Sequence, residues 1–207
     1  MGRSWKSVEI ATFITVMASK LKPSARTILN LGVGDGSLAP MLMDRFRGAS
    51  LKGIDRDQTR LGLVEGQLGF YEGKVDLQLG DLLTVPLGSG YDLVVSSAAL
   101  RHMAPDEKQR LYSRVHQSLA DDGMFVFGDR VRLASPRVAQ AVREMRAEEM
   151  QAIAANGKGQ PPADFRAPDS KDRITISDTL YGLRKAAFRD VECLFCYGDR
   201  AIFAGFK

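Results

Sequence analysis

Three glycines at alternate positions, Gly32, Gly34 and Gly36, follow an apolar run in "ILNLGVGDGSL" (28–38) and precede a helical pattern. A glycine-rich turn between a strand and a helix lets the backbone approach a ligand closely. The turn could serve packing alone, or it could be a dinucleotide fingerprint, which needs glycine where this chain has Ser37. The spacing favours a third interpretation, a nucleoside pocket of the S-adenosylmethionine type.

Two carboxylates follow apolar runs downstream. Asp55 comes twenty-one residues after Gly34, where a carboxylate can accept hydrogen bonds from both ribose hydroxyls. Asp81 is placed to accept from an adenine amino group, with Leu82 and Arg56 flanking the ring. A single aspartate at a strand end could instead cap a helix or lie in a solvated turn. Two of them in register with the glycine turn favour ligand binding, because open α/β sheets bind ligands at the carboxyl ends of their strands.

The elements that must position these residues are short apolar runs alternating with amphipathic helices. This alternation predicts an α/β fold, Rossmann-like, with a mostly parallel sheet. Strands are predicted over 26–31, 49–55, 74–80, 91–97 and 124–131, and helices over 37–46, 57–68, 105–120, 135–156 and 175–188. The last run, 189–207, reads as two strands joined at Gly198-Asp199, so the sheet should end with an antiparallel hairpin.

We expect one domain over residues 1–207. Residues 1–25 should contain an amphipathic helix that packs on the domain, since Glu9, Thr12 and Thr15 interrupt its apolar run. Residues 156–173 are rich in glycine, proline and charge, which predicts a loop or a lid over the site. No apolar run approaches the length of a membrane span, and export is unsupported, so the cytoplasm is the expected compartment.

Composition limits the classes of molecule that the protein is expected to bind. The net charge is only +4, and the basic residues are scattered without interleaved aromatic residues, which disfavours a nucleic-acid partner. The two cysteines, Cys193 and Cys196, are three residues apart on a predicted strand and should lie on opposite faces. No second pair or nearby histidine completes a metal site, so we expect no metal.

The sequence resembles the class I S-adenosylmethionine-dependent methyltransferases, particularly the small single-domain enzymes that methylate natural products and small metabolites. The resemblance runs from about residue 25 to the C-terminus. It rests on "ILNLGVGDGSL", "GID", "GDLL", "YDLVVSSAALRHM" and the ending "AAFRDVECLF…AIFAGFK". It implies a seven-stranded sheet of order 3-2-1-4-5-7-6, with S-adenosylmethionine as the cofactor. The implied cofactor-binding residues are Asn30, Gly32, Val33, Gly34, Asp55, Arg56, Asp81, Leu82 and Ser97.

The chain departs from this family in two ways. The family usually has an acidic residue where this chain has Asn30, and that carboxylate helps to bind the ammonium of the cofactor's methionine part. Asn30 keeps an acceptor oxygen but loses the charge. Many relatives also have an N-terminal segment that closes over the cofactor, whereas about twenty-five residues precede the first strand here. Either that cap is reduced or the 156–173 loop covers the site.

Methyl transfer from a sulfonium is an in-line displacement that depends mainly on alignment of the reacting groups. His102, just past the fourth strand, is the candidate general base, or else a loop histidine with local contacts. Arg101 could bind an acidic substrate or point to solvent. Asp129 and Arg130, at the end of the fifth strand, are further candidates for substrate contact, and His116 reads as structural.

The hypothesis is therefore methyl transfer to a small molecule. An Asn-Pro-Pro-Tyr type motif of nucleic-acid amino methylation is absent. A non-catalytic S-adenosylmethionine-binding or partner-binding module, or an enzyme that uses the cofactor for another purpose, are the alternatives. The sequence leaves open the acceptor, the atom that is methylated and the oligomeric state.

Overall fold

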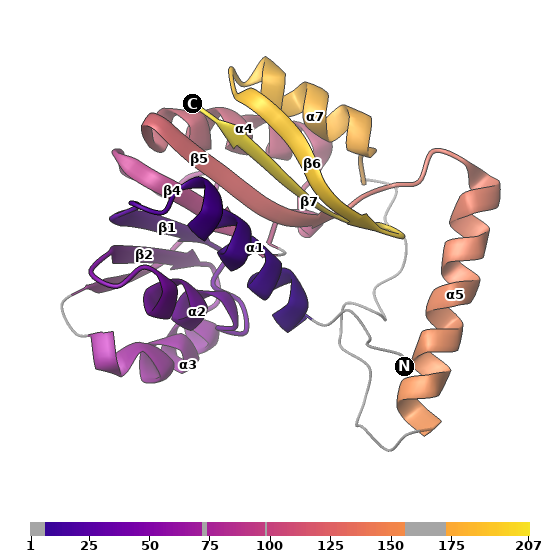
Figure 1. Ribbon diagram of the computed structural model, residues 1–207, viewed down its shortest axis with the longest axis horizontal. Helices are drawn as coiled ribbons and strands as arrows, with labels where there is room; N and C mark the ends of the chain where they lie inside the picture. Colours follow the sequence, from indigo (N-terminus) through magenta and orange to yellow (C-terminus); the bar gives the residue numbers. More distant parts are fainter. Residues whose placement is uncertain (1–6, 72–73, 98, 156–172) are drawn as a thin grey trace.

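The computed structural model describes residues 7–71, 74–97, 99–155 and 173–207 (Figure 1). They form a seven-stranded sheet of order β3-β2-β1-β4-β5-β7-β6, as the family resemblance implied. The strands are β1 (Thr27–Leu31), β2 (Ser50–Asp55), β3 (Val75–Leu79), β4 (Tyr91–Ser96), β5 (Leu119–Arg130), β6 (Arg189–Tyr197) and β7 (Arg200–Phe206). Strands β1 to β5 pair in parallel, whereas β7 runs antiparallel between β5 and β6.

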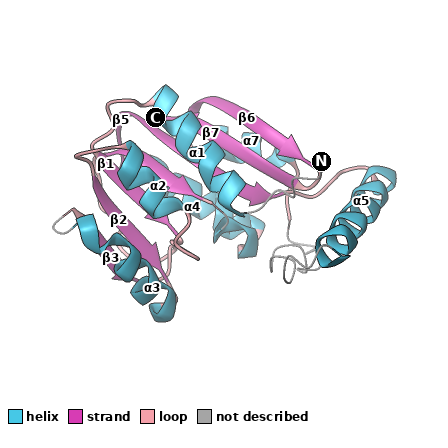
Figure 2. Ribbon diagram, turned by 60° about the horizontal axis from the view of Figure 1, so that its bottom comes forward, coloured by secondary structure: helices cyan, strands magenta, loops and turns pink. Residues whose placement is uncertain are grey.

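Helices cover both faces of the sheet (Figures 1 and 2). They are α1 (Ser7–Leu21), α2 (Leu38–Arg45), α3 (Gln58–Leu68), α4 (Pro105–Ser118), α5 (Pro136–Ala155) and α7 (Ile176–Lys185), with short 3₁₀ turns η1 (Gly69–Tyr71) and η2 (Ala99–His102). Helices α1, α2 and α3 contribute Ile14, Leu42 and Val64 to one core. On the opposite face, α4 and α7 contribute Leu111 and Leu183 to the other. None of the described helices is long and apolar enough to cross a membrane.

The fifth strand begins earlier than predicted. The sequence pattern placed its start at 124, because Asp122-Gly123 reads as a turn, but β5 begins at Leu119, which pairs with Tyr91. The register shifts between this pair and Leu93, and Asp122 has φ of 60°. The strand therefore continues through a local irregularity, and the turn-like residues around Asp122 remain part of β5.

Helix α5 stands apart from the other helices, beyond the end of β5 (Figure 1). Tyr197 on β6 donates from its hydroxyl to Glu149 on α5 at 2.6 Å, and Arg146 on α5 lies 2.9 Å from Asp199. The helix is thus anchored on the β6–β7 hairpin. Of the predicted loop or lid, residues 156–172 lie outside the described part of the chain.

Candidate functional site

A cleft of about 240 Å³ opens at the carboxyl ends of β1, β2, β3 and β4. Of the residues that the sequence singled out, six line it together: Gly32, Asp55, Arg56, Asp81, Leu82 and His102. Their elements are separated in the chain but adjacent in the sheet, as the strand order requires. The cleft lies where α/β sheets of this kind bind ligands.

Asp55 links β2 to the glycine turn. Its Oδ2 accepts from the N–H of Gly34 at 3.0 Å, and its Oδ1 accepts from the N–H of Asp57 at 3.0 Å. The residue is only 6% exposed. A carboxylate has about four acceptor positions, so Asp55 keeps capacity for ribose hydroxyls while it holds the turn.

The three glycines of the turn have different roles. A Cβ at Gly32 would lie 2.3 Å from the Cβ of Ala99, and one at Gly36 would lie 2.2 Å from Oε1 of Gln67. Ala99 therefore leaves no room for a side chain at Gly32, and the positive φ of +78° favours glycine at 36. Gly34 has φ of +60°, and the only atom near its Cβ direction is the Gly32 carbonyl oxygen at 3.9 Å. Gly32 lines the cleft, whereas Gly34 is held by its bond to Asp55.

Asp81 begins the loop after β3. Its Oδ1 accepts from the N–H of Leu83 at 2.7 Å, which fixes the carboxylate at the rim. Leu82 and Leu83 both line the cleft and supply apolar contact surface. Leu82 is buried, which suits a wall against a flat ring rather than a solvated turn.

The sequence analysis missed seven lining residues: Asp57, Arg60, Gly80, Leu83, Ala99, Met103 and Glu107. Most are neighbours of predicted ones. Glu107 is different, because it comes from the first turn of α4 and its Oε2 accepts from the N–H of Ala104 at 2.8 Å. In the sequence, Glu107 belongs to the acidic first turn of the helix that begins at Pro105. Such a turn is typical of helix capping and does not by itself indicate a ligand site.

Asn30 lies on β1, beside Gly53 of β2 and Val95 of β4. It is fully buried, and neither Oδ1 nor Nδ2 has a hydrogen-bond partner. An unsatisfied buried polar group costs about 1–3 kcal/mol. Val33 is also buried, so neither side chain lines the cleft, and the amide is left with both a donor and an acceptor to satisfy.

His102 is exposed at the end of η2 and accepts on its Nε2 from Nε–H of Arg101 at 3.0 Å. This bond requires the proton of the neutral imidazole to be on Nδ1. Arg101 itself is not among the lining residues. Ser97 lies just past β4, where its carbonyl oxygen packs against Gly128, and it does not line the cleft either.

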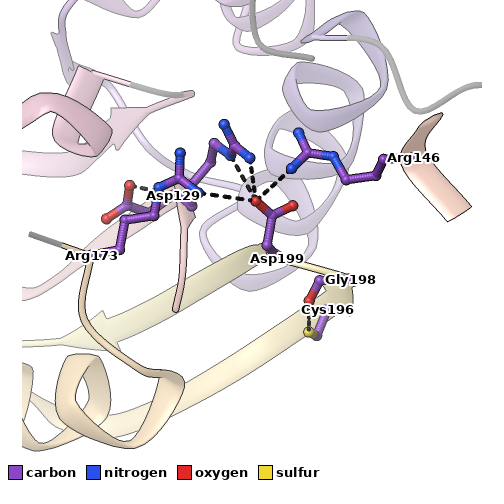
Figure 3. Close-up of polar contacts among 7 residues, drawn as sticks. Asp129, Arg146, Arg173, Cys196, Gly198 and Asp199 are labelled. Atoms are coloured by element: carbon purple, nitrogen blue, oxygen red, sulfur yellow. Dashed lines mark hydrogen bonds and ion pairs between the residues drawn. The ribbon is translucent and has the colours of Figure 1, made fainter. Parts of the chain in front are cut away.

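Asp129 and Arg130 are buried in ion pairs away from the cleft. Asp129 lies 2.5 Å from Nζ of Lys108, and both side chains are 1% exposed. Burial raises the pKa of Asp129, although the Lys108 ammonium opposes this. Arg130 donates from its Nε to Asp199 at 2.9 Å, and Figure 3 shows guanidinium groups converging on that aspartate.

The remaining titratable candidates have no place in the cleft. His116 packs edge-on to Phe188, and burial lowers its pKa. Cys193 and Cys196 are free thiols, and Cys196 is the more exposed. Among the described residues, no three histidine, cysteine or acidic side chains gather in a way that could hold a metal ion.

These residues fit S-adenosylmethionine. Asp55 has spare acceptor positions, Gly32 of the turn lines the cleft, and Asp81 stands next to an apolar wall. Asp55 and Asp81 would hold the ribose and the adenine. The tail would then point toward the glycine turn and η2.

A sequence model of the "Methyltransferase domain" family matches residues 28–123. Carboxy-S-adenosyl-L-methionine synthase of Campylobacter concisus is 20% identical over 92% of this chain and 81% of that protein. Among solved structures, an O-methyltransferase family protein of Burkholderia thailandensis has a TM-score of 0.69 at 13% identity, over 97% of this chain. Human N-acetylserotonin methyltransferase, in complex with S-adenosylmethionine, has a TM-score of 0.62 at 16% identity, over 98% of this chain.

This chain spans 57% and 56% of the length of those two structures. The domain match covers the glycine turn, Asp55, Asp81 and the strand that precedes His102. The two structures share its fold. Together these findings show that residues 28–123 are similar to a methyltransferase domain and that the chain has the fold of these two structures.

Proposed function

We propose that this protein transfers a methyl group from S-adenosylmethionine to a small-molecule acceptor, and not to a nucleic acid. The observation that carries the proposal is the single cleft that joins Asp55, bonded to the glycine turn, with Asp81. This pairing suits an adenosine with free ribose hydroxyls. A 2′-phosphate would be repelled by the Asp55 carboxylate.

When bound, the cofactor supplies an electrophilic methyl on a positively charged sulfur. The protein's task is then to align an acceptor nucleophile with that methyl and to exclude water. Arg56 and Leu82 would flank the adenine, and η2 would form the wall nearest the methyl.

His102 is proposed as the proton acceptor for a protonated nucleophile. Its Nε2 is bonded to Arg101, so an acceptor hydroxyl or amine would replace that N–H before transferring its proton to the ring. Glu107, on the same cleft wall, would hold a second polar group of the acceptor. Neither residue distinguishes oxygen, nitrogen and carbon as the methylated atom.

A second candidate function is modification of the cofactor itself, which would make the chain similar to carboxy-S-adenosyl-L-methionine synthase. The alignment to that relative covers most of both chains. Asn30 supports this candidate, because a neutral amide there leaves the methionine end of the site without the usual countercharge.

Titration calorimetry with S-adenosylmethionine and S-adenosylhomocysteine tests the cofactor. Failure of both ligands to bind would refute both candidates. Methyl-labelled cofactor is then incubated with a panel of acceptors and, separately, with a panel of carboxylic acids that could donate a carboxyl group. In mass spectrometry of the cofactor products, S-adenosylhomocysteine indicates methyl transfer, and a heavier cofactor indicates modification. Tight binding with neither product would favour a non-catalytic binding module.

A further inference from the structure

Arg114 on α4 holds the loop that follows β3. Its two terminal nitrogens, Nη1 and Nη2, donate to the carbonyl oxygens of Leu83 and Val85. The same loop carries Asp81 and Leu82, which line the cleft. One planar guanidinium group therefore fixes two carbonyl groups of the segment against which the proposed function places the adenine.

Asp81 holds the backbone of this loop from within. Its carboxylate accepts from the N–H of Leu83 at 2.7 Å, and its carbonyl oxygen accepts from the N–H groups of Thr84 at 3.0 Å and Val85 at 2.8 Å. Within the described part of the chain, no group accepts from the N–H of Leu82. The loop therefore offers an amide donor next to a carboxylate acceptor at the wall of the cleft.

This pair of groups matches one edge of adenine. The adenine amino group can donate to the Asp81 carboxylate while the ring nitrogen N1 accepts from the Leu82 N–H. A 6-oxo purine has the opposite pattern at both positions, because its O6 is an acceptor and its N1 carries a proton. A site built to form hydrogen bonds rejects a ligand that leaves its polar groups unpaired, so the cleft distinguishes the two bases while this spacing is kept.

Packing links the position of Val85 to the same wall. A Cβ at Gly80 would lie 2.7 Å from Cγ2 of Val85, so this side chain packs directly on the backbone of Gly80, which also lines the cleft. Leu82 and Val85 belong to one core cluster with Leu111 of α4. A shift of the Val85 carbonyl would therefore move the wall that faces the adenine.

The guanidinium group of Arg114 is oriented by the loop. Its Nε is buried and has no hydrogen-bond partner among the described residues. A buried donor without a partner lowers stability, so the two bonds to Leu83 and Val85 are what this orientation serves. Arg114 is not among the residues that line the cleft, and it acts on the site only through the loop.

We propose that Arg114 is a positioning residue that makes the cleft select adenine over a 6-oxo purine. By holding the carbonyls of Leu83 and Val85, it fixes the spacing between the Asp81 carboxylate and the Leu82 N–H. This inference rests on the proposed function, because it requires the adenine of the cofactor to lie against this loop.

Titration calorimetry with S-adenosylhomocysteine and its 6-oxo analogue, S-inosylhomocysteine, tests the selection. Wild type should bind the adenine ligand about ten- to a hundredfold more tightly. R114M loses both carbonyl bonds, so the ratio of the two dissociation constants should fall about fivefold or more. R114K keeps the charge but not the two-pronged geometry, and its ratio should lie between those of wild type and R114M.

R110M is the matched control. Arg110 lies on the same helix, and its side chain is 63% exposed beside Asp106, so R110M should keep the wild-type ratio. A merely structural role of Arg114 would weaken the binding of both ligands by the same factor. An unchanged ratio in R114M or in R114K would therefore overturn the proposal, and R114K supplies this test if R114M does not fold.

The same titrations separate this proposal from the proposed function. A wild-type protein that binds both ligands equally would overturn the role of Arg114 alone, because a cofactor site would still be present. If neither ligand binds to wild type, the proposed function fails and this proposal fails with it.

Hydrogen exchange tests the loop without a ligand. In R114M the N–H groups of Leu83 and Val85 should exchange faster than in wild type and in R110M. The N–H of Gly80, which donates to the carbonyl of Asp55 at 2.9 Å, should exchange at the same rate in all three proteins. Equal exchange of the loop amides in R114M and wild type would show that Asp81 alone fixes the loop, and this would overturn the proposal.

Discussion

At the scale of single residues, Asp55 combines a structural and a binding role. Its two oxygens hold the N–H groups of Gly34 and Asp57, and the same carboxylate lines the cleft. The turn and the ligand site therefore depend on one buried charge. This explains why a short side chain that reaches both is needed at the end of β2.

Replacing Asp55 with asparagine separates the two roles. The amide oxygen of D55N can still accept from Gly34, but the charge is lost. A hydrogen bond to a charged group contributes about 1.5–3 kcal/mol, so the Kd for S-adenosylmethionine should rise roughly ten- to hundredfold. Calorimetry measures this. D106N, at an exposed position on α4, is the control, and equal affinities in the two variants would contradict the assignment.

Asn30 presents the opposite case, a buried polar side chain without a hydrogen-bond partner. Its replacement by leucine, of similar size, should raise the free energy of unfolding of the ligand-free protein by about 1–2 kcal/mol, because a desolvated amide is removed. Urea unfolding measures this change, and a less stable N30L would show that the amide is satisfied in solution.

At the scale of the elements, a buried ion pair joins α4 to β5. Lys108 lies in the first turns of the helix that follows His102, and Asp129 ends the strand. Tyr112, one turn further, places its hydroxyl in the same buried region, and burial raises the pKa of that hydroxyl well above its usual value. The pair thus fixes the helix that carries one wall of the cleft.

Breaking this pair should be costly. K108M and D129N each leave one charge or polar group buried without its partner, and each should destabilise the protein by about 3–5 kcal/mol. The double variant K108M/D129N should cost clearly less than the sum, because both charges are gone. Urea unfolding of the full cycle measures the coupling, and additive losses would argue against a direct interaction.

Asp92 connects β4 to the start of β1. Its Oδ2 accepts from the N–H groups of Arg26 and Thr27, at 2.7 and 3.0 Å, and from the Thr27 hydroxyl at 3.0 Å. Burial opposes ionisation, but these bonds outweigh it and hold the pKa of Asp92 below its ordinary 3.8. The folded state is therefore stabilised above the unfolded pKa, and this contribution is lost as the pH falls through the lower folded pKa.

Substitution of the Asp92 carboxylate tests whether its contribution to stability is lost as the pH falls. D92N should show a shallower loss of stability on the acid side than wild type, because the titrating group is gone. Urea unfolding at a series of pH values gives both slopes. Identical acid slopes would show that the Asp92 bonds do not contribute to the pH dependence.

At the scale of the whole molecule, Asp199 joins three distant segments. One carboxylate oxygen contacts Arg130 at the end of β5, Arg146 on α5 and Arg173 ahead of α7 (Figure 3). Asp199 lies in the turn between β6 and β7, so its contact with Arg146 attaches α5 to this hairpin. Burial of these charges makes their attraction stronger than at the surface.

Loss of this charge should release α5. D199N should increase hydrogen exchange in residues 136–152 and lower the thermal midpoint, while exchange in β1 and β4 stays as in wild type. D190N, at an exposed position at the start of β6 and far from the turn that carries Asp199, is the control and should leave α5 unchanged. Unaltered exchange in α5 of D199N would mean that the Tyr197–Glu149 bond is sufficient to anchor it.

Much of this architecture was predictable from the sequence. Apolar periodicity placed four of the first five strands within a residue or so at each end, because strands covered on both faces leave continuous apolar runs. The start of β5 was missed, since Asp122-Gly123 has turn chemistry that the sheet absorbs as an irregularity. Pairing with β4 overrides the tendency of Asp122 and Gly123 to form a turn.

The sequence by itself determined the fold class, the strand order expected from the family and the glycine turn with Asp55 and Asp81. These depend on local spacing and on strand ends that a parallel sheet must bring together. The tertiary structure alone decided that Ala99 leaves no room for a side chain at Gly32, that Asp129 and Arg130 are buried in ion pairs, and that Glu107 lines the cleft. Each of these depends on which residue from a distant segment occupies the neighbouring space, and spacing along the chain does not carry that information.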